Sequence, residues 1–221
     1  ASGNMGQAVV KKFLAEGYHV TGTVIPNDPV KPEISHAAFE TITADLMSEM
    51  AAAEMVKAVS AKRGSIDAAV LTVGGFAMGD IAGTSSADIL KQYKLNFETA
   101  YHVARPVFAK MMQQGRGRIF LIGSRPGIDM HNSKGMVGYG LAKSLIFRLA
   151  ELMNEEAKGT NVVTVVIVPS TIDTAQNRKA MPGADFSKWV TPEAIADTIC
   201  FYCTDDAAAL RESVLKLYGN S

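Results

Sequence analysis

The 221-residue sequence lacks several features that would point directly to a class of partner. It has 22 basic and 22 acidic residues, so no excess of charge favours nucleic acid or an anionic membrane as a partner. No stretch approaches the roughly 18 to 20 apolar residues of a membrane span, and none shows the charged and then apolar pattern of a signal peptide. We therefore expect a cytoplasmic protein that binds neither nucleic acid nor a membrane.

Metal-ligating residues are also sparse. The sequence has two cysteines, Cys200 and Cys203, which form a C-x-x-C pattern in an expected helix. A redox pair or half of a zinc site is conceivable, but a zinc site needs a second pair of ligands, so we interpret both as packing residues. The histidines show no metal-ligand spacing; they are His19, His36, His102 and His131. We expect no metal site.

The pattern of apolar residues predicts the fold class. Apolar residues make up 48% of the chain, and its length suits one substantial domain. Strands are expected at 19–25, 39–44, 67–73, 117–124 and 161–168, and helices after Gly6 and at 47–61, 86–112, 138–157 and 192–202, with a kink or boundary at Pro106. Strands that alternate with helices predict an α/β, Rossmann-like fold with a doubly wound parallel sheet, three αβα layers and one domain over 1–221.

The first segment suggests a phosphate-binding turn. Gly3 and Gly6 precede a periodic apolar run, and glycines before a helix let the backbone and its amides approach a pyrophosphate. The strand that should come before such a turn is not in the sequence, so we expect upstream residues to be missing.

Tyr139 and Lys143 form the most informative pair. They are four residues apart and so lie one turn apart on a helix face. A neighbouring ammonium favours the phenolate, so Lys143 is predicted to lower the pKa of Tyr139 and make it a usable general acid or base. The alternative is a tyrosine packed under a lysine stem.

Other polar or glycine residues follow the expected strands. Loops after parallel strands meet at one sheet edge, and those that join Tyr139 and Lys143 there are Asp45, Gly74, Gly75, Asn96 and Ser124. A hydroxyl, a phenol and an ammonium at this edge would polarise a carbonyl and exchange a proton with it. Asp45 is alternatively a helix N-cap, and Asn96 alternatively bonds to the backbone.

These residues, in this order and spacing, carry a resemblance. The chain resembles the short-chain dehydrogenase/reductases over its whole length, on the segments 1–6, 45–46, 73–75 and 169–174 together with Asn96, Ser124, Tyr139 and Lys143. The resemblance implies an enzyme in which Tyr139 exchanges a proton with the substrate and Lys143 contacts the nicotinamide ribose. Ser124 would hold the substrate oxygen and Asn96 would anchor a water-mediated proton relay.

The resemblance also implies a nicotinamide dinucleotide, NAD or NADP, as the hydride carrier. The residues that would bind it are Ser2, Gly3, Asn4, Met5, Gly6, Asp45, Leu46, Gly74, Gly75, Tyr139, Lys143, Pro169, Thr171, Ile172 and Thr174. Thr174 would contact the carboxamide or the pyrophosphate, or alternatively close a turn. The second strand ends in Thr23-Val24-Ile25, without a carboxylate for the ribose 2′-hydroxyl, which slightly favours NADP.

Residues 135–143 and 171–189 resemble dihydropteridine reductases more specifically. Ser124 is absent from those pteridine reductases, which favours a small carbonyl or alcohol substrate over a quinonoid pterin. Segment 172–190 is expected to cover the substrate with Met181, Phe186 and Trp189, which would otherwise be core residues.

Two further alternatives concern turnover and assembly. A dinucleotide-binding sensor or scaffold without turnover is the alternative to an oxidoreductase, although a pure binder needs no phenol or relay. Helices within 93–112 and 139–152 are apolar around much of their circumference. The family resemblance implies that they form the interface of a homodimer or homotetramer; the alternative is burial against the sheet.

Overall fold

The computed structural model describes residues 1–30, 32–129 and 133–220. These residues group into two compact units: the first contains 1–45, 169–210 and 216–220, and the second contains 46–168 and 211–215. Each unit is described by itself, and the assignment of a single domain remains a prediction.

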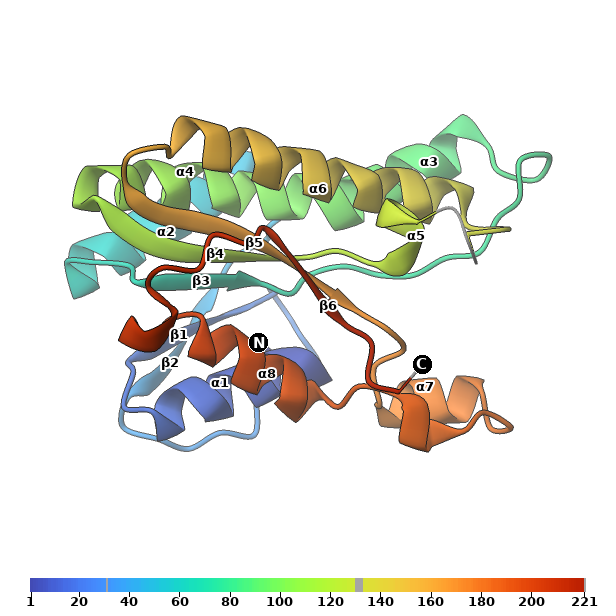
Figure 1. The fold of residues 1–221 in the computed structure, drawn as a ribbon, viewed down its shortest axis with the longest axis horizontal. Helices are drawn as coiled ribbons and strands as arrows, with labels where there is room; N and C mark the ends of the chain where they lie inside the picture. Colours follow the sequence, from blue (N-terminus) through green and yellow to red (C-terminus); the bar gives the residue numbers. More distant parts are fainter. Residues whose placement is uncertain (31, 130–132, 221) are drawn as a thin grey trace. The chain divides into compact units, whose positions relative to one another are not determined.

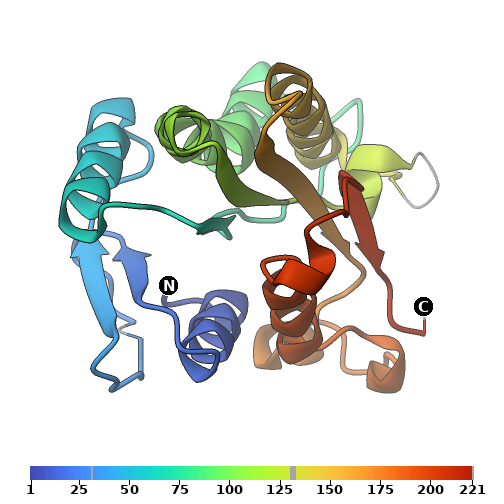
Figure 2. The ribbon, with the colours of Figure 1, turned by 60° about the vertical axis from the view of Figure 1, so that its left-hand side comes forward.

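The first unit contains two parallel strands and most of the chain's terminal segments. Its elements are α1 (Asn4–Ala15), β1 (Val20–Val24), β2 (Phe39–Thr43), α7 (Ala175–Ala180), η2 (Phe186–Lys188), α8 (Pro192–Phe201) and η3 (Asp205–Ala207). Helices α1 and α8 pack together (Figures 1 and 2). Apolar side chains one turn apart bury the facing surfaces, as with Val9 and Phe13 on α1 and Ile195 and Ile199 on α8.

The second unit is built on a sheet in the order β3-β4-β5-β6. Its strands are β3 (Ala68–Leu71), β4 (Arg116–Ile122), β5 (Asn161–Pro169) and β6 (Val214–Leu217), of which β6 ends among residues of the first unit. Its helices are α2 (Glu49–Arg63), α3 (Ser86–Tyr93), η1 (Lys94–Glu98), α4 (Thr99–Gln114), α5 (Arg125–Ile128) and α6 (Val137–Glu156). Strands β3, β4 and β5 pair in parallel.

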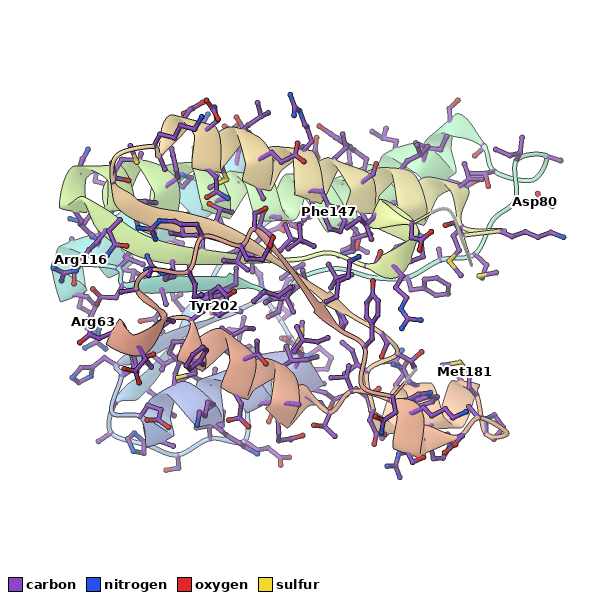
Figure 3. All side chains as sticks on the ribbon, viewed as in Figure 1. Arg63, Asp80, Arg116, Phe147, Met181 and Tyr202 are labelled. Carbon is purple, nitrogen blue, oxygen red and sulfur yellow. The ribbon has the colours of Figure 1, made fainter. Side chains whose placement is uncertain are left out.

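Helices α4 and α6 pack along one face of this sheet (Figure 1). Strands β4 and β5 are almost entirely buried, which explains their continuous apolar sequences. Phe147, labelled in Figure 3, packs from α6 onto Gly123, where an added Cβ would lie 2.8 Å from its ring. The close approach of helix and strand fixes the position of the α6 side chains nearby.

The predicted α/β class with parallel strands is confirmed, and each predicted strand overlaps an observed one. Strand β6 and the short helices α5 and α7 were not predicted. Pro106 lies inside α4, so a helix boundary at this proline is wrong, while a kink there stays a prediction. The helix is instead interrupted by the π-turn η1, which contains Asn96. Propensity locates a proline, but a π-turn is set by packing and side-chain bonding and is common at functional sites.

Within the described ranges, no helix is both long and apolar enough to traverse a bilayer. The same ranges hold no cluster of three potential metal ligands among histidine, cysteine, aspartate and glutamate. His131 lies outside the described residues. Cys200 in α8 and Cys203 in the turn that follows it form no disulfide with a described residue.

Candidate active site

Asn96 braces the loop that follows β3. Its side chain is 1% exposed, and its Oδ1 accepts a hydrogen bond from the Gly75 amide at 3.0 Å while its Nδ2 donates to the Gly75 carbonyl at 2.9 Å. Nδ2 also lies 3.0 Å from Oε1 of Gln92, one turn earlier. The backbone-bonding alternative for Asn96 is therefore observed, and it fixes the glycine loop; the relay role stays a prediction.

Lys143 lies beside this loop. Its side chain is 5% exposed and its Nζ donates a hydrogen bond to the carbonyl of Ile122, at the end of β4, at 2.7 Å. Burial lowers the pKa of the Lys143 ammonium from 10.5 to about 8. A Cβ on Gly74 would be 2.8 Å from Asn96 Oδ1 and 3.4 Å from Lys143 Nζ, so the absence of a side chain at 74 lets these groups meet.

Ser124 and Tyr139 lie next to each other at the start of α5 and α6. The Ser124 Oγ is buried, and its interaction with the neighbouring Tyr139 hydroxyl falls short of good hydrogen-bond geometry. The ring of Tyr139 packs edge-on against Phe76 with centroids 5.1 Å apart. Burial raises the pKa of the Tyr139 phenol above 10, and the neighbouring Ser124 hydroxyl opposes this in part.

The prediction that Lys143 lowers the pKa of Tyr139 was therefore wrong for the chain by itself. The Lys143 Nζ is 5.9 Å from the centroid of the Tyr139 ring, and its hydrogen bond is to Ile122. Desolvation of the phenol is the largest influence on its pKa. At neutral pH Tyr139 is protonated and is a proton donor.

A cavity of about 260 Å³ opens beside Tyr139 within the second unit. It is lined by Ala77, Met78, Gly79, Gly83, Thr84, Asp88, Lys91, Gln92, Gly138 and Tyr139. The two loops that border it are joined, since Gly79 donates to the carbonyl of Gly135 and accepts from the amide of Val137. Asp80, labelled in Figure 3, shapes the outer turn by accepting the Gly83 amide at 2.7 Å. This volume is slightly below that of typical drug-sized ligand pockets, so it limits the occupant to a small molecule.

The second unit also has donors that fit a dinucleotide. An ammonium has three donors, and the only bond of Lys143 Nζ to a described residue is the one to Ile122. The remaining donors suit ribose hydroxyls. The other predicted cofactor residues of this unit are Leu46, Gly74, Gly75 and Tyr139, of which all but Leu46 surround or adjoin the Asn96–Lys143 pair.

The remaining predicted cofactor residues belong to the first unit: Ser2, Gly3, Asn4, Met5, Gly6, Asp45, Pro169, Thr171, Ile172 and Thr174. Gly3 caps α1 without a side-chain bond, so the first amides of α1 have no side-chain cap and suit an anion. Ser2 donates its hydroxyl to Asp28 at 2.6 Å.

The helix N-caps in the structure decide two alternatives that the sequence left open, for Asp45 and for Thr174. Asp45 is not a helix N-cap, since α2 begins after Ser48, whose hydroxyl accepts the amide of Ala51. Thr174 does cap α7, accepting the amide of Asn177 at 3.1 Å. In the same unit, Arg178 stacks over Phe186, whose ring lies 4.8 Å from that of Trp189.

Sequence reasoning missed two residues, Gln92 and Asp28. Gln92 is four residues before Asn96, and this helical spacing was a signal that the two amides would meet. Asp28 lies in the proline-rich loop after β1. A loop has no periodic pattern from which its contact with Ser2 could be predicted.

The chain is similar in sequence and in fold to known proteins. The model of the short chain dehydrogenase family matches residues 1–184. The chain is 26% identical to the uncharacterized oxidoreductase YvrD of Bacillus subtilis over 99% of this chain and 92% of that one. It is also 26% identical to a dihydropteridine reductase of Dictyostelium discoideum, over 97% and 90% of the two chains.

Solved structures share the fold. A short-chain type dehydrogenase/reductase of Mycobacterium ulcerans superposes with a TM-score of 0.86 at 22% identity, over 99% of this chain and 86% of that one. The structure of ElxO with NADP bound also has a TM-score of 0.86, at 20% identity, over 98% of this chain and 93% of that one.

Proposed function

Since this chain belongs to the short-chain dehydrogenase family and is an NAD(P)-dependent oxidoreductase, we propose that it interconverts a small carbonyl compound and its alcohol at Tyr139. The observation that carries the proposal is the close grouping of Gly74, Asn96 and Lys143, with Tyr139 on the wall of the adjoining cavity.

Each side chain has a role that follows from its chemistry. Tyr139 is protonated at neutral pH and donates its proton to the carbonyl oxygen as a general acid. The buried Ser124 hydroxyl donates a hydrogen bond to the same oxygen, which supplies the partner it otherwise lacks. The bound nicotinamide supplies the hydride.

Lys143 and Asn96 support the proton donor. Lys143 contributes a positive charge and free donors for ribose hydroxyls. Asn96 holds the Gly75 backbone and the π-turn in position, and we propose that it anchors the water through which Tyr139 is reprotonated.

Both NAD and NADP remain in the proposal. The end of β1 favoured NADP slightly, but the carboxylate of Asp28 is bonded to Ser2 in the predicted phosphate-binding turn. That hydrogen bond lowers the pKa of Asp28, so the group is charged at neutral pH. A carboxylate accepts a ribose 2′-hydroxyl and repels a 2′-phosphate, so we propose that Asp28 sets the ratio of NADH to NADPH use.

A dihydropteridine reductase-like activity is the second candidate. It is favoured by the similarity to the Dictyostelium protein of that name. The presence of Ser124 favours an ordinary carbonyl, because the serine provides a donor for a carbonyl oxygen.

The proposal is tested by mixing the protein with NADH or NADPH and a panel of ketones, quinones and quinonoid dihydropterin, and following cofactor absorbance. Tyr139→Phe is expected to lower kcat by roughly 10²- to 10⁴-fold while leaving cofactor binding intact. Tyr18→Phe, which keeps the edge-on ring contact of residue 18 with Phe13, is the matched control. Full turnover by Tyr139→Phe would refute the mechanism, and cofactor binding without any turnover would favour a sensor.

We also propose a homodimer or homotetramer. Helices α3, α4 and α6 expose apolar side chains, namely Leu90, Tyr101, Leu141, Leu145 and Leu152, and exposed apolar patches mark association surfaces. Light scattering on a sizing column measures the assembly, and a monomeric mass would contradict the proposal.

A further inference from the structure

Gln92 is a buried polar residue on the wall of the substrate cavity. It lies in α3, is only 6% exposed, and lines the cavity together with Tyr139 and Gly138. A Cβ on Gly138 would be 3.3 Å from Cγ of Gln92, so the glycine lets α6 pack closely against this side chain. Its position is therefore tightly restricted.

The backbone of Gly75 determines which way the Gln92 amide faces. A backbone N–H can only donate, so the atom of Asn96 that it meets at 3.0 Å must be the oxygen Oδ1. Asn96 therefore directs its NH₂ group toward Gln92, and Gln92 must present its oxygen, Oε1, at 3.0 Å. The reverse orientation would set two NH₂ groups against each other.

This arrangement leaves the NH₂ group of Gln92 without a protein acceptor. Its Nε2 donates no hydrogen bond within 1–30, 32–129 and 133–220, and it is not among the buried atoms sealed from solvent. Because Gln92 lines the cavity, we infer that this otherwise buried side chain turns its unpaired donors toward the cavity. Buried polar groups normally have partners, so these donors call for a ligand acceptor.

We propose that Nε2 of Gln92 donates a hydrogen bond to a second oxygen of the substrate, so that the cavity selects carbonyl compounds carrying a further acceptor. Oxo esters and oxo acids belong to this class, and simple ketones do not. The inference rests on the proposed carbonyl chemistry at Tyr139.

The other polar groups of the wall are consistent with this role. The Asp88 carboxylate is already bonded to the amide and hydroxyl of Ser85 at 3.0 and 2.6 Å, as part of the α3 capping box. Lys91 contributes a positive charge to the same wall. An acceptor with a negative charge would gain from Lys91, whereas a neutral one would depend on Gln92, so the test includes both.

The test measures kcat/KM for 2-, 3- and 4-oxo esters, the corresponding acids, and length-matched methyl ketones. The wild type is expected to prefer an acceptor-bearing compound by at least about tenfold at one spacing, because a buried donor rejects an analogue that leaves it unpaired. Gln92→Leu removes both the oxygen and the NH₂ group of the side-chain amide. Gln92→Glu, assayed at pH 8, retains an oxygen for Asn96, removes the donor and adds a negative charge, so its preference is measured with the uncharged oxo esters and ketones.

Both variants are expected to lose most of the preference while ketone reduction changes little, since Asn96 remains bonded to Gly75. Gln113→Leu, at an exposed position of α4, is the matched control and should keep the wild-type preference. Thermal unfolding of each variant verifies that the fold is retained.

Several outcomes would overturn the inference. A wild type without preference, or variants that keep it, would show that Gln92 does not contact substrate. If both variants lose kcat/KM equally for ketones and for oxo esters, Gln92 only supports Asn96 and does not select the substrate. If Tyr139→Phe is inactive while the Gln92 substitutions leave the substrate preference unchanged, only this inference fails. A wild type that reduces nothing in the panel overturns the proposed function as well.

Discussion

The side-chain amide of Asn96 and the backbone of Gly75 exchange two hydrogen bonds, at 3.0 and 2.9 Å. A second pair in the same unit has the same form: Asn154 donates to the carbonyl of Thr164 and accepts its amide, both at 2.8 Å. The first pair lies at the candidate site and the second lies at the other end of α6, so they provide a matched comparison.

Asn96→Ala is expected to leave the Gly75 amide and carbonyl without their side-chain partner and to lower the free energy of unfolding by about 1–3 kcal/mol. Turnover should also fall, because the loop holding Gly74 beside Lys143 is released. Urea unfolding and steady-state rates measure the two effects. Asn154→Ala should cost similar stability with little change in turnover, and equal rate losses in both variants would contradict a specific role for Asn96.

Ser124→Ala is expected to lower activity while leaving stability almost unchanged, which is the reverse of the result expected for Asn154→Ala. The Oγ has no well-formed hydrogen bond in the described structure, so its removal is expected to change the free energy of unfolding by less than about 1 kcal/mol or to stabilise the protein. We expect kcat to fall by roughly 10²-fold if the hydroxyl binds the substrate oxygen.

Thr164 provides the control for this substitution. Its Oγ1 is likewise buried without a partner, but it lies in the core strand β5. Thr164→Val should be neutral or stabilising and leave kcat unchanged. A Ser124→Ala enzyme with wild-type kcat would remove Ser124 from the mechanism.

The buried Lys143 should make stability depend on alkaline pH. Its pKa is about 8 in the folded chain and 10.5 as the ordinary value, so between these pH values the unfolded chain binds more protons than the folded one. The free energy of unfolding should therefore rise with pH across this window, by up to about 3 kcal/mol from this group. Below pH 8 the penalty for burying the charge is present in full.

Urea unfolding of the wild type and Lys143→Met at pH 7.5 and pH 10 measures this contribution as a difference. The wild type should gain stability relative to the variant on going to pH 10. A difference that is constant with pH, or that changes in the opposite direction, would show that the Lys143 pKa is not lowered.

Asp28→Asn is expected to raise kcat/KM for NADPH relative to NADH by about tenfold or more, since it removes a charge that would repel a 2′-phosphate. The Ser2 hydroxyl and the Val30 amide bond to different oxygens of the Asp28 carboxylate. Asparagine keeps one oxygen for the Val30 amide, and its NH₂ group replaces the other oxygen and donates to the Ser2 hydroxyl. Asp206→Asn, at an exposed site in η3, is the charge-matched control. An unchanged cofactor ratio in Asp28→Asn would place the carboxylate away from the ribose.

The sequence by itself determined the order of strands and helices, because period and apolar content are local properties that a buried parallel sheet imposes on its strands. It also identified Asn96, Ser124, Tyr139 and Lys143 as candidates through residue type and spacing. Tertiary structure decided what depends on contacts between distant segments. These include the π-turn around Asn96, the Asp28–Ser2 bond and the orientation of the Gln92 amide.

The pKa of Tyr139 is the clearest case. Helical spacing correctly placed Lys143 one turn away, but burial of the phenol raises its pKa, and the hydrogen bond of the Lys143 ammonium is to the Ile122 carbonyl. Spacing along a helix fixes which residues are neighbours. Desolvation depends on everything that packs around them, and only the folded chain sets that.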